Sequence, residues 1–493
     1  MNAIVDFGKK IISSERWHMV AILAMYVLLA VEYYRFVYLN CYIMGFDFRW
    51  SPVAVLVGFL FLAILVYVLF GIPLKDDGSY AVSMIVAVLF CLPSIVMYQI
   101  GRITVFVPVY TLLFVVLLRT PLLEIRRWPL PRIPVRWQRL VLPVVCLICL
   151  LPFPIAYGFH IDLSLFSLGE ETYKVREAIS AKDNLLTSYL MGPLRMVLLP
   201  MLIVYGMTDF RKNWWMAIMG IAGMLFLFLL NPQKSIFFSV AVVLAFFFFR
   251  EYKAKAGVFL CLMLAVCLLA VALNVVTGNL MVESILLRRL LFVPAMLSDS
   301  YFVFFDRHPM LLSHSFLSHW FDNPYSMSPA NLMGKMLFNL TTSSCNTGIV
   351  GDGFMNFGHI GAVMFVAIGA LIIRFIDSQV NHARFFGLLV LLVITFLNSA
   401  LFTTMLTHGG LVLIEITKSP DSVGLPLKFP LLNFMPSGKS PSIDHFIVFE
   451  PVAVIFCLYA CLSLPFGSFC GVVIVGGTLV FITTFLVALP SAF

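Results

Sequence analysis

Long apolar stretches alternate with short polar segments along almost the whole chain. An α-helix rises about 1.5 Å per residue, so about 20 apolar residues cross the roughly 30 Å hydrocarbon core of a bilayer. Such stretches recur at 17–39, 52–72, 80–98, 103–118, 138–157, 186–207, 213–230, 234–249, 256–276, 358–376, 385–407, 447–465 and 469–489. The pattern predicts an all-α polytopic membrane protein, a single membrane domain with about 11–13 transmembrane helices.

Three longer polar segments interrupt this pattern, at 158–188, 277–357 and 417–446. The segment 277–357 carries paired arginines, three histidines and many aromatic residues. Loops that a rigid scaffold presents concentrate binding and catalytic residues, so 158–188 and 277–357 are predicted to be functional loops. The segment 417–446 is polar and contains five prolines, and we assign it no function.

The composition agrees with a membrane protein and argues against other classes. Only 11% of the residues are charged, against about 25% in an average soluble domain. The net charge of +8 is spread over turns that flank the apolar stretches, which does not indicate nucleic-acid binding. Most of the ten cysteines, among them Cys146/Cys149 and Cys457/Cys461, fall inside apolar stretches, so no disulfide framework is predicted.

Lysine and arginine in short loops set the orientation of a membrane protein, with the excess on the cytoplasmic side. Segment 119–139 holds six arginines and one acid, Glu124. If it is cytoplasmic, the alternation of helices puts seventeen basic residues on that side and six in the short loops opposite. The N-terminus is then predicted to be cytoplasmic, with 158–188 and 277–357 facing outward. Cytosolic nucleotides do not reach that side, so an enzyme there would use a lipid-borne substrate.

The first outward loop and the segments after it supply four candidate residues. Tyr173 and Arg176 lie in a short patch with helical spacing, where arginine suits a phosphate or diphosphate group; a solvated amphipathic helix is the alternative. Arg195 follows a Gly-Pro pair inside a predicted helix, where a charge either faces a cavity or snorkels to the interface. Lys234 lies in a tight outward turn, which by itself indicates only a turn.

The large outward loop supplies seven more candidates. Arg288 and Arg289 follow an apolar run, and they suit either a diphosphate clamp or an anchor for lipid headgroups. His314 offers a base near neutral pH. Asp352 and Asn356 are four residues apart and are expected on one face of the incoming helix. The other two candidates are Tyr325 and Asn346.

Several motifs of nucleotide and metal chemistry are absent from the sequence. There is no Gly-x4-Gly-Lys-Ser/Thr phosphate loop, no His-Glu-x-x-His zinc motif and no Asp-x-Asp pair. Neither a metal site nor a cofactor is therefore predicted.

Taken in order, these residues resemble the bacterial oligosaccharide repeat-unit polymerases, the Wzy-type O-antigen polymerases. The resemblance runs from about Glu170 to Gly410, close to half of the chain. It rests on the ordered motifs Tyr173-Lys-Val-Arg176, Lys234-Ser, Arg288-Arg-Leu-Leu-Phe-Val-Pro294, Ser313-His-Ser315, Pro324-Tyr325 and Asn346-Thr-Gly348…Asp352-Gly-Phe-Met-Asn356-Phe-Gly358. Their order and their confinement to predicted outward segments make the set more specific than any single motif. The resemblance fails after Gly410, where 417–446 replaces the apolar helix expected soon afterwards.

The resemblance implies a fold like the membrane-embedded, lipid-donor (GT-C-like) glycosyltransferases in the bacterial inner membrane. It implies that a growing glycan on undecaprenyl diphosphate is transferred, on the periplasmic side, onto a new lipid-linked repeat unit. The implied partners are undecaprenyl-diphosphate-linked oligosaccharide, membrane lipid, a flippase and a chain-length regulator, without nucleic acid or cofactor.

Roles for the candidates follow from this expected reaction. Arg176, Arg288 and Arg289 would bind the diphosphates, because arginine neutralises the charge of the leaving group without a metal. His314 or Asp352 would deprotonate the acceptor hydroxyl. The remaining candidates would contact substrate, and they are Tyr173, Arg195, Lys234, Tyr325, Asn346 and Asn356.

Two alternatives stay open from the sequence. An O-antigen ligase also uses a lipid-diphosphate donor and differs in its acceptor. A lipid-linked oligosaccharide flippase or other transporter is expected to carry charges deep in several helices and to show internal repeats. Arg195 is nearly the only charge expected at depth, so the sequence favours chemistry at the membrane surface over translocation.

Overall fold

The computed structural model describes residues 12–41, 44–72, 78–120, 135–158, 184–208, 210–230, 235–249, 251–315, 318, 320–340, 344–379, 383–416, 470–475 and 478–483. The helices up to residue 230 are α2 (Glu15–Glu32), η1 (Tyr33–Tyr38), α3 (Leu39–Cys41), α4 (Pro52–Val66), η3 (Tyr67–Gly71), α5 (Gly78–Val86), η4 (Ala87–Cys91), α6 (Leu92–Ile100), α7 (Phe106–Arg119), α8 (Val135–Leu150), α9 (Pro152–Tyr157), α11 (Leu185–Pro193), η6 (Leu194–Leu198), α12 (Leu199–Thr208) and α13 (Phe210–Leu230). Those that follow are α14 (Ser235–Phe247), α15 (Tyr252–Thr277), α16 (Leu280–Glu283), η7 (Ser284–Phe292), α17 (Val293–Phe305), α18 (Pro329–Phe338), α19 (Ile349–Gln379), η8 (Ala383–Phe385), α20 (Phe386–Asn398), α21 (Leu401–Leu406) and α22 (Gly410–Ile416).

Eight helical stretches are long and apolar enough to cross a membrane: Glu15–Cys41, Pro52–Gly71, Gly78–Ile100, Leu140–Tyr157, Leu186–Thr208, Phe210–Leu230, Tyr252–Thr277 and Ile349–Ser378. Three shorter apolar helices accompany them, at Phe106–Arg119, Ile236–Phe247 and Ala383–Asn398. Each coincides with an apolar stretch of the sequence. The chain is a polytopic helical membrane protein, as the hydrophobic pattern predicts.

Two of the predicted transmembrane stretches are wrong in detail. The stretch 385–407 is not one helix, because the chain leaves the helical conformation at Ser399 and α21 begins only at Leu401. The stretch 469–489 is not helical where it is described: β1 (Cys470–Val475) and β2 (Thr478–Thr483) pair antiparallel, with Cys470 opposite Thr483. Both strands are rich in the β-branched residues that favour extended backbone. The stretches 417–446 and 447–465 lie outside the described residues.

Polar contacts between helix starts and ends distinguish two ends of the bundle, which we call the proximal end and the distal end. At the proximal end, Glu15 near the start of α2 pairs with Lys253 near the start of α15 at 2.7 Å. At the same end, Asp377 near the end of α19 accepts a hydrogen bond from the backbone of Ser79 at the start of α5. These contacts agree with the predicted alternation, which places residues 15, 75, 253 and 374 on one side.

The distal end gathers the connections on the other side of the bundle. Asp299 of α17 accepts a hydrogen bond at 2.7 Å from the backbone of Thr104, in the connection before α7. Met296 of α17 lies against Gly45, in the connection before α4. The described segments of the distal end are 44–51, 101–105, 277–279, 306–315, 318, 320–340 and 344–348.

The segment 277–357, predicted as one outward loop, is helical over much of its length. After Gly278, which ends α15 with φ +69°, the chain continues from Leu280 to Phe305 as α16, η7 and α17 without a break. This helix packs against α6, α15 and α19, and it also contacts the connections at 44–51 and 101–105. Many of its apolar residues are buried, so it is part of the helix packing and does not project as a loop.

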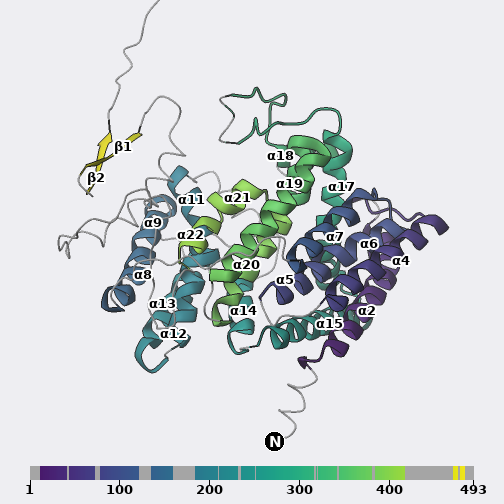
Figure 1. Cartoon of the computed structure of the whole chain (residues 1–493), viewed down its shortest axis with the longest axis horizontal. Coiled ribbons are helices and arrows are strands. Elements are labelled where there is room, and N and C mark those ends of the chain that lie inside the picture. The colour runs from purple at the N-terminus through teal and green to yellow at the C-terminus, as the bar shows by residue number, and fades with distance from the viewer. Residues whose placement is uncertain are drawn as a thin grey trace, which may run out of the picture.

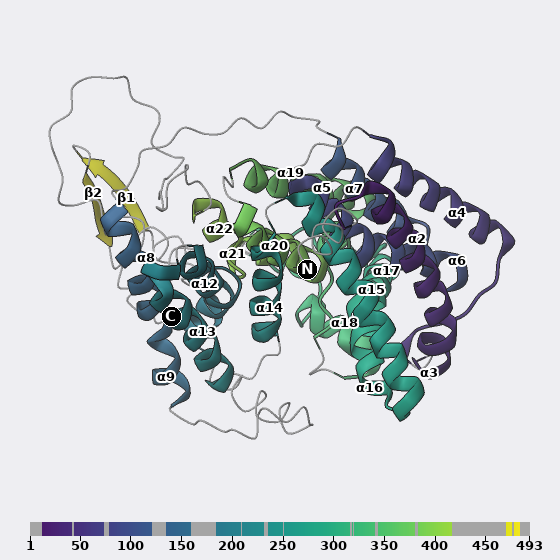
Figure 2. The same ribbon diagram turned by 90° about the horizontal axis from the view of Figure 1, so that it is seen from below.

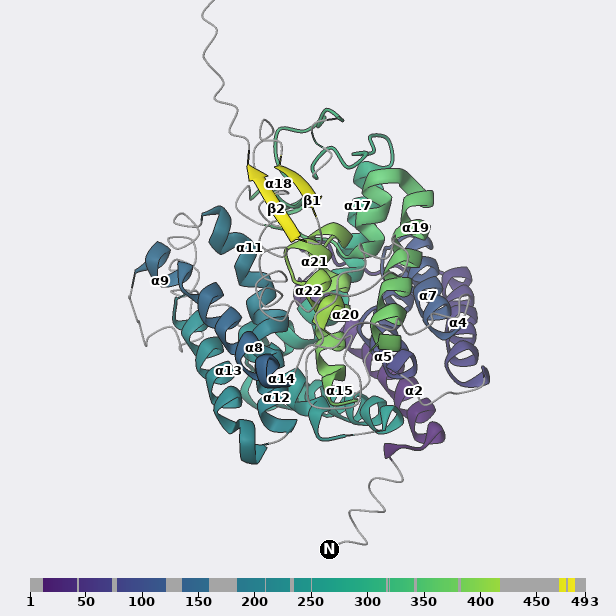
Figure 3. The same cartoon turned by 60° about the vertical axis from the view of Figure 1, so that its left-hand side comes forward.

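The helices form two groups with a bridge between them (Figure 1). One group contains α8, α9, α12 and α13, and the other contains α2, α4, α6, α7 and α15 (Figure 2). Helix α20 lies between the groups, where it packs against α14 on one side and α19 on the other. Helices α21 and α22 follow in the same central position (Figure 3). The continuous helix from α5 through α6 is buried along its apolar span and forms the interior of the second group.

Acids from neighbouring helices cap helix N-termini, and of the two examples Asp352 is buried and Asp377 is half-buried. The first backbone N–H groups of a helix have no partner within that helix, and a negative charge there suits the helix dipole. Asp377 binds the backbone N–H of Ser79 at 3.0 Å at the start of α5. Asp352 binds the N–H of Leu401 at 2.8 Å at the start of α21. Buried charged residues are therefore more numerous than the sequence predicts, and some of them, such as Asp352, cap helix ends.

Basic side chains bind carbonyl groups at or near helix C-termini in the same way. Arg374 donates to the carbonyl of Thr120 at 2.6 Å after α7, and Arg384 donates to that of Thr208 at 3.1 Å at the end of α12. Lys255 is 0% exposed and donates to the carbonyl of Phe246 at 2.6 Å, near the end of α14. Lys255 is the buried member of this set, so the carbonyl groups that it binds are shielded from water, whereas Arg374 and Arg384 are half-buried.

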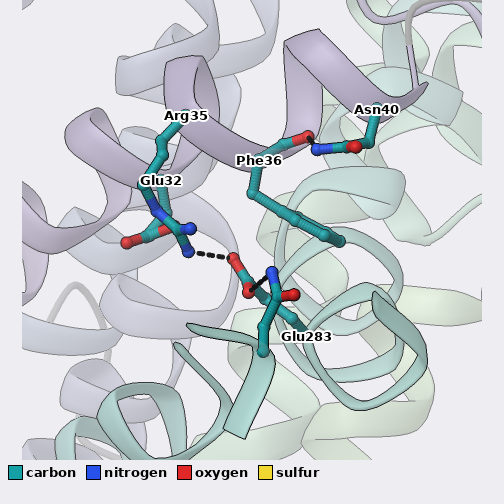
Figure 4. A network of polar contacts seen from close by, with 6 residues as sticks. Glu32, Arg35, Phe36, Asn40 and Glu283 are labelled. Atoms are coloured by element: carbon teal, nitrogen blue, oxygen red, sulfur yellow. Dashed lines mark hydrogen bonds and ion pairs between the residues drawn. The ribbon is translucent and has the colours of Figure 1, made fainter. Parts of the chain in front are cut away.

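A separate polar network joins α2 and η1 to α15 and α16 (Figure 4). Arg35 contacts both Glu32, at 2.6 Å, and Glu283, at 2.5 Å. Asn274 donates to the other oxygen of Glu283 at 2.5 Å. Both acids are buried, so the network holds the start of the 280–305 helix against the first helix of the chain.

Replacing Lys255 tests the capping of helix ends. Lys255→Met leaves buried carbonyls at the end of α14 without a donor, which costs about 2–4 kcal/mol of unfolding free energy. The control is Lys253→Met on the same helix, because the Lys253–Glu15 pair is 28% and 44% exposed and such a pair contributes at most about 1 kcal/mol. Thermal unfolding of the detergent-purified variants measures the difference. Equal melting temperatures for the two variants would contradict the capping role.

Candidate functional site

Helix α21 is a short element whose first end is held by Asp352. This carboxylate is 4% exposed, and its Oδ2 accepts the N–H of Leu401 at 2.8 Å. Its Oδ1 accepts a hydrogen bond at 3.1 Å from Asn356, one turn further along α19. The sequence prediction that Asp352 and Asn356 share a helix face is confirmed. Because both carboxylate oxygens accept hydrogen bonds, the geometry favours a structural role for Asp352, and its role as a base stays a prediction.

Asn356 also anchors the distal segment that precedes α18. Its Oδ1 accepts the N–H of Leu312 at 2.9 Å, and its backbone carbonyl accepts the N–H of Leu311 at 3.2 Å. Leu311 and Leu312 have φ values of +49° and +62°, a left-handed conformation that is strained for leucine. The α19 helix breaks next to Asn356, with Gly358 at φ +62°, so its carbonyl is turned from the helix toward this segment.

The C-terminal end of α21 packs closely against the start of the helix that runs from residue 185 to residue 208. A Cβ on Gly192 would overlap the carbonyl oxygen of Thr407, and Gly409, at φ +87°, lies against Pro193. Only glycine permits so close an approach of two backbones. The turn Thr407–Gly409 is thereby fixed one helical turn from Arg195.

Arg195 and His408 form an electrostatic pair at this end. Arg195 is half-buried in η6, and His408 is half-buried in the turn after α21. Burial, and then the positive charge of Arg195, lower the pKa of His408 to about 4. The imidazole is therefore neutral at pH 7 and has a lone pair for a proton, next to a fixed cation.

Three further candidates lie in the described part of the segment 306–348. His314 lies in the turn at 311–315 and is largely exposed, and local packing around the imidazole lowers its pKa. Tyr325 packs against Phe304 and Phe305, with ring centroids 5.7 and 5.8 Å apart. Asn346 is exposed and accepts a hydrogen bond from Ser344 at 3.4 Å.

Arg288 and Arg289 lie on η7, within a helix. Arg288 donates to Ser284 at 3.0 Å and contacts the sulfur of Met44 at 3.0 Å, whereas Arg289 is exposed. The helix that carries Arg288 and Arg289 lies in the group that contains α2 and α15. Helices α12 and α13 belong to the other group, on the opposite side of α20 (Figure 2). The predicted diphosphate pair therefore lies apart from Arg195.

Three predicted site residues, Tyr173, Arg176 and Lys234, lie outside the described residues. The structure in turn adds His408, which the sequence interpretation left without a role. The sequence signal was its position between Thr407 and a Gly-Gly pair, after a broken apolar stretch. Within the described ranges, no group of three His, Cys, Asp or Glu side chains is placed to hold a metal ion.

Comparison with known proteins found no matching family model, no matching curated protein and no matching solved structure.

The pKa of His408 predicts how stability depends on pH. The unfolded side chain has a pKa near 6.5 and the folded one about 4, so the unfolded chain takes up the proton first as pH falls. Stability from this residue is constant above pH 6.5 and is lost between pH 6.5 and 4, at up to about 1.4 kcal/mol per pH unit.

The measurement is the thermal unfolding of wild type and His408→Gln at several pH values. The wild type should lose more stability than His408→Gln between pH 6.5 and 5, before most carboxyl groups titrate. Parallel curves in this window would refute the placement of His408.

Proposed function

We propose that this protein is a membrane-embedded glycosyltransferase that uses a polyprenyl-diphosphate-linked glycan, specifically an O-antigen repeat-unit polymerase of the bacterial inner membrane. The observation that carries the proposal is the close approach of Gly192 to the backbone of Thr407, which brings Arg195 within electrostatic range of His408. A cation and a neutral base close enough to interact electrostatically are the two groups that this transfer needs when no metal takes part.

In the proposed reaction, His408 and Arg195 each have one role. His408 accepts the proton of the acceptor hydroxyl as its oxygen attacks the anomeric carbon of the donor glycan. The bond between that carbon and the diphosphate oxygen breaks, and the electron pair leaves with the lipid diphosphate. Arg195 stabilises the negative charge that develops on this leaving group, and it is most effective where little water is present.

The separation of Arg195 from Arg288 and Arg289 suits a reaction with two lipid diphosphates. The donor diphosphate lies at the reacting carbon. The acceptor diphosphate lies a whole repeat unit away from the attacking hydroxyl, because the hydroxyl belongs to the far end of the oligosaccharide. We place the donor diphosphate at Arg195 and the acceptor diphosphate at Arg288 and Arg289, where guanidinium groups bind phosphate oxygens in pairs.

The other predicted residues keep supporting roles in this proposal. Asp352 and Asn356 position α21, and His314, Tyr325 and Asn346 border the acceptor path. Tyr173, Arg176 and Lys234 stay proposed substrate contacts from the sequence alone. The periplasmic orientation of the distal end rests on the excess of basic residues in the opposite loops. A GT-C-like fold is proposed from the family resemblance alone.

Deletion of the gene tests the proposed activity. We expect the mutant to carry lipid A–core with a single repeat unit, because flipping and ligation proceed while polymerisation stops. A gel of surface polysaccharide shows the pattern. A mutant without any repeat unit on lipid A–core would instead identify a ligase or a flippase, and an unchanged ladder would exclude all three.

Complementation with Arg195→Gln tests the central cation. Loss of one charged donor to a developing negative charge costs about 100- to 1000-fold in rate, so the ladder should collapse to the single-repeat pattern at normal protein level. The matched control is Arg102→Gln, because Arg102 is a distal arginine whose side chain is 72% exposed. A full ladder from Arg195→Gln, or the same loss from Arg102→Gln, would contradict the assignment.

A further inference from the structure

Two buried acids share a single cation at the start of the helix 280–305. Arg35 of η1 binds both Glu32 of α2 and Glu283 of α16 through one nitrogen atom, Nη2, at 2.6 and 2.5 Å. The three side chains point toward one another (Figure 4). Both acids are buried, whereas the side chain of Arg35 is 37% exposed, so protons reach the network from its side. With both carboxyl groups ionised, the network would carry one uncompensated negative charge.

The charges around Glu283 do not remove this excess. Among the described residues, the charges that act on Glu283 are those of Arg35 and Glu32. Arg288 and Arg289 lie on η7, the element that follows Glu283, but neither acts on it. The guanidinium group of Arg35 therefore faces two carboxyl groups without a second cation.

The other groups that face the network supply hydrogen bonds or packing and no positive charge. From α15, Asn274 donates to Glu283 at 2.5 Å, and the buried thiol of Cys267 faces Glu32. From η1, the hydroxyl of Tyr33 donates to a backbone carbonyl at 2.6 Å. An excess negative charge in this place is costly, because burial disfavours a charge that lacks a partner.

A proton on Glu283 removes the excess charge. Glu283 is hydrogen-bonded to the carboxyl group of Glu32, and two carboxyl groups this close do not readily ionise together. Burial raises the pKa of Glu283 and Glu32 raises it further, whereas Asn274 and Arg35 lower it. The unfolded side chain has a pKa near 4.5. Stability from this proton is therefore full below pH 4.5 and is lost as the pH rises toward the pKa of the folded chain.

We propose that the Glu32–Arg35–Glu283 network is a proton-dependent latch, which holds the start of the helix 280–305 on α2 and η1 while the two acids share a proton and releases it when that proton is lost. Loss of the proton leaves an unpaired charge among buried groups, and exposure of Glu283 to water stabilises that charge. Gly278 is the hinge, because it ends α15 with φ +69° and α16 after it has four residues.

The latch also positions the two arginines of η7. Arg288 and Arg289 follow Glu283 on the same continuous helix, and Arg288 contacts the sulfur of Met44 at 3.0 Å. Release at Glu283 therefore displaces both guanidinium groups. The latch goes beyond the proposed function and does not depend on it. One consequence does rest on that function: the acceptor diphosphate would bind more tightly while the network is protonated.

Labelling of the native Cys41 measures the release. This thiol is buried, and Arg288 of η7 lies within electrostatic range of it, so movement of η7 should uncover it. Detergent-purified protein is treated with N-ethylmaleimide between about pH 5 and pH 9, across the range in which a raised carboxyl pKa falls. Mass spectrometry then quantifies the labelled peptide that contains Cys41. Comparison of each variant with the wild type at the same pH cancels the pH dependence of thiol reactivity.

Glu283→Gln and Glu32→Gln should both stay latched, since each leaves one acid with one cation. At acidic pH the wild type should be labelled as slowly as these variants. At alkaline pH it should be labelled faster than they are, with a ratio that grows by up to about tenfold per pH unit, because one proton is linked to release. Ordinary ion pairs predict the reverse, since loss of either acid would then loosen the helix and speed labelling. Faster labelling of the variants, or equal labelling at every pH, overturns the proposal.

Glu15→Gln is the matched control. Glu15 is another acid of α2, but its side chain is partly exposed and it pairs with Lys253 at the proximal end. Labelling of Glu15→Gln should follow the wild type at every pH. Slow labelling of this control at alkaline pH would assign the effect to the charge of α2 as a whole and overturn the latch. The measurement uses purified protein without substrate, so its result is independent of whether deletion of the gene alters the surface polysaccharide.

Discussion

Helix ends inside a membrane bundle leave backbone groups without partners, and this constraint explains where several of the charged residues lie. Lipid supplies no hydrogen bonds, so each such group needs a side chain from a neighbouring helix. Asp377 and Asp352 meet this need at N-termini, and Arg374, Arg384 and Lys255 meet it at C-terminal carbonyls. Each sign matches the helix dipole. The bundle is thus joined through its helix ends as well as through its apolar faces.

This constraint changes how a buried charge is interpreted. A buried carboxylate in a predicted outward segment suggests catalysis when the sequence is considered alone, as Asp352 did. In the structure the two carboxylate oxygens of Asp352 accept hydrogen bonds from Leu401 and Asn356, so the burial of Asp352 has a structural cause. Arg195 and His408 differ, because the charge of Arg195 acts on an imidazole in another segment. A functional assignment is stronger for such a pair than for a charge that caps a helix.

The sequence predicted the elements whose signal is local. Apolar length located most of the transmembrane helices, and the i, i+4 spacing placed Asp352 and Asn356 on one face. The break before α21 was not predictable in this way, because Ser399 and Ala400 lie within a continuous apolar stretch, and the capping group, Asp352, is distant in sequence. The helix 280–305 was missed because its charged residues resemble those of a loop until their partners are known. His408 was missed because Gly192 and Arg195, which position and perturb it, precede it by more than 200 residues.

In the proposed reaction, the electrostatic effect of Arg195 on His408 would couple donor binding to the strength of the base. Burial and the positive charge of Arg195 lower the pKa of His408 to about 4, which makes the imidazole neutral but weakly basic. A diphosphate bound at Arg195 offsets that positive charge, so it raises the pKa of His408 toward its ordinary value. The base becomes effective only when the donor is in place, and its affinity for the proton falls again when the lipid diphosphate departs. Such coupling opposes transfer without a donor, and it requires both ends of α21 to be fixed, since the effect depends on the distance between one guanidinium and one imidazole.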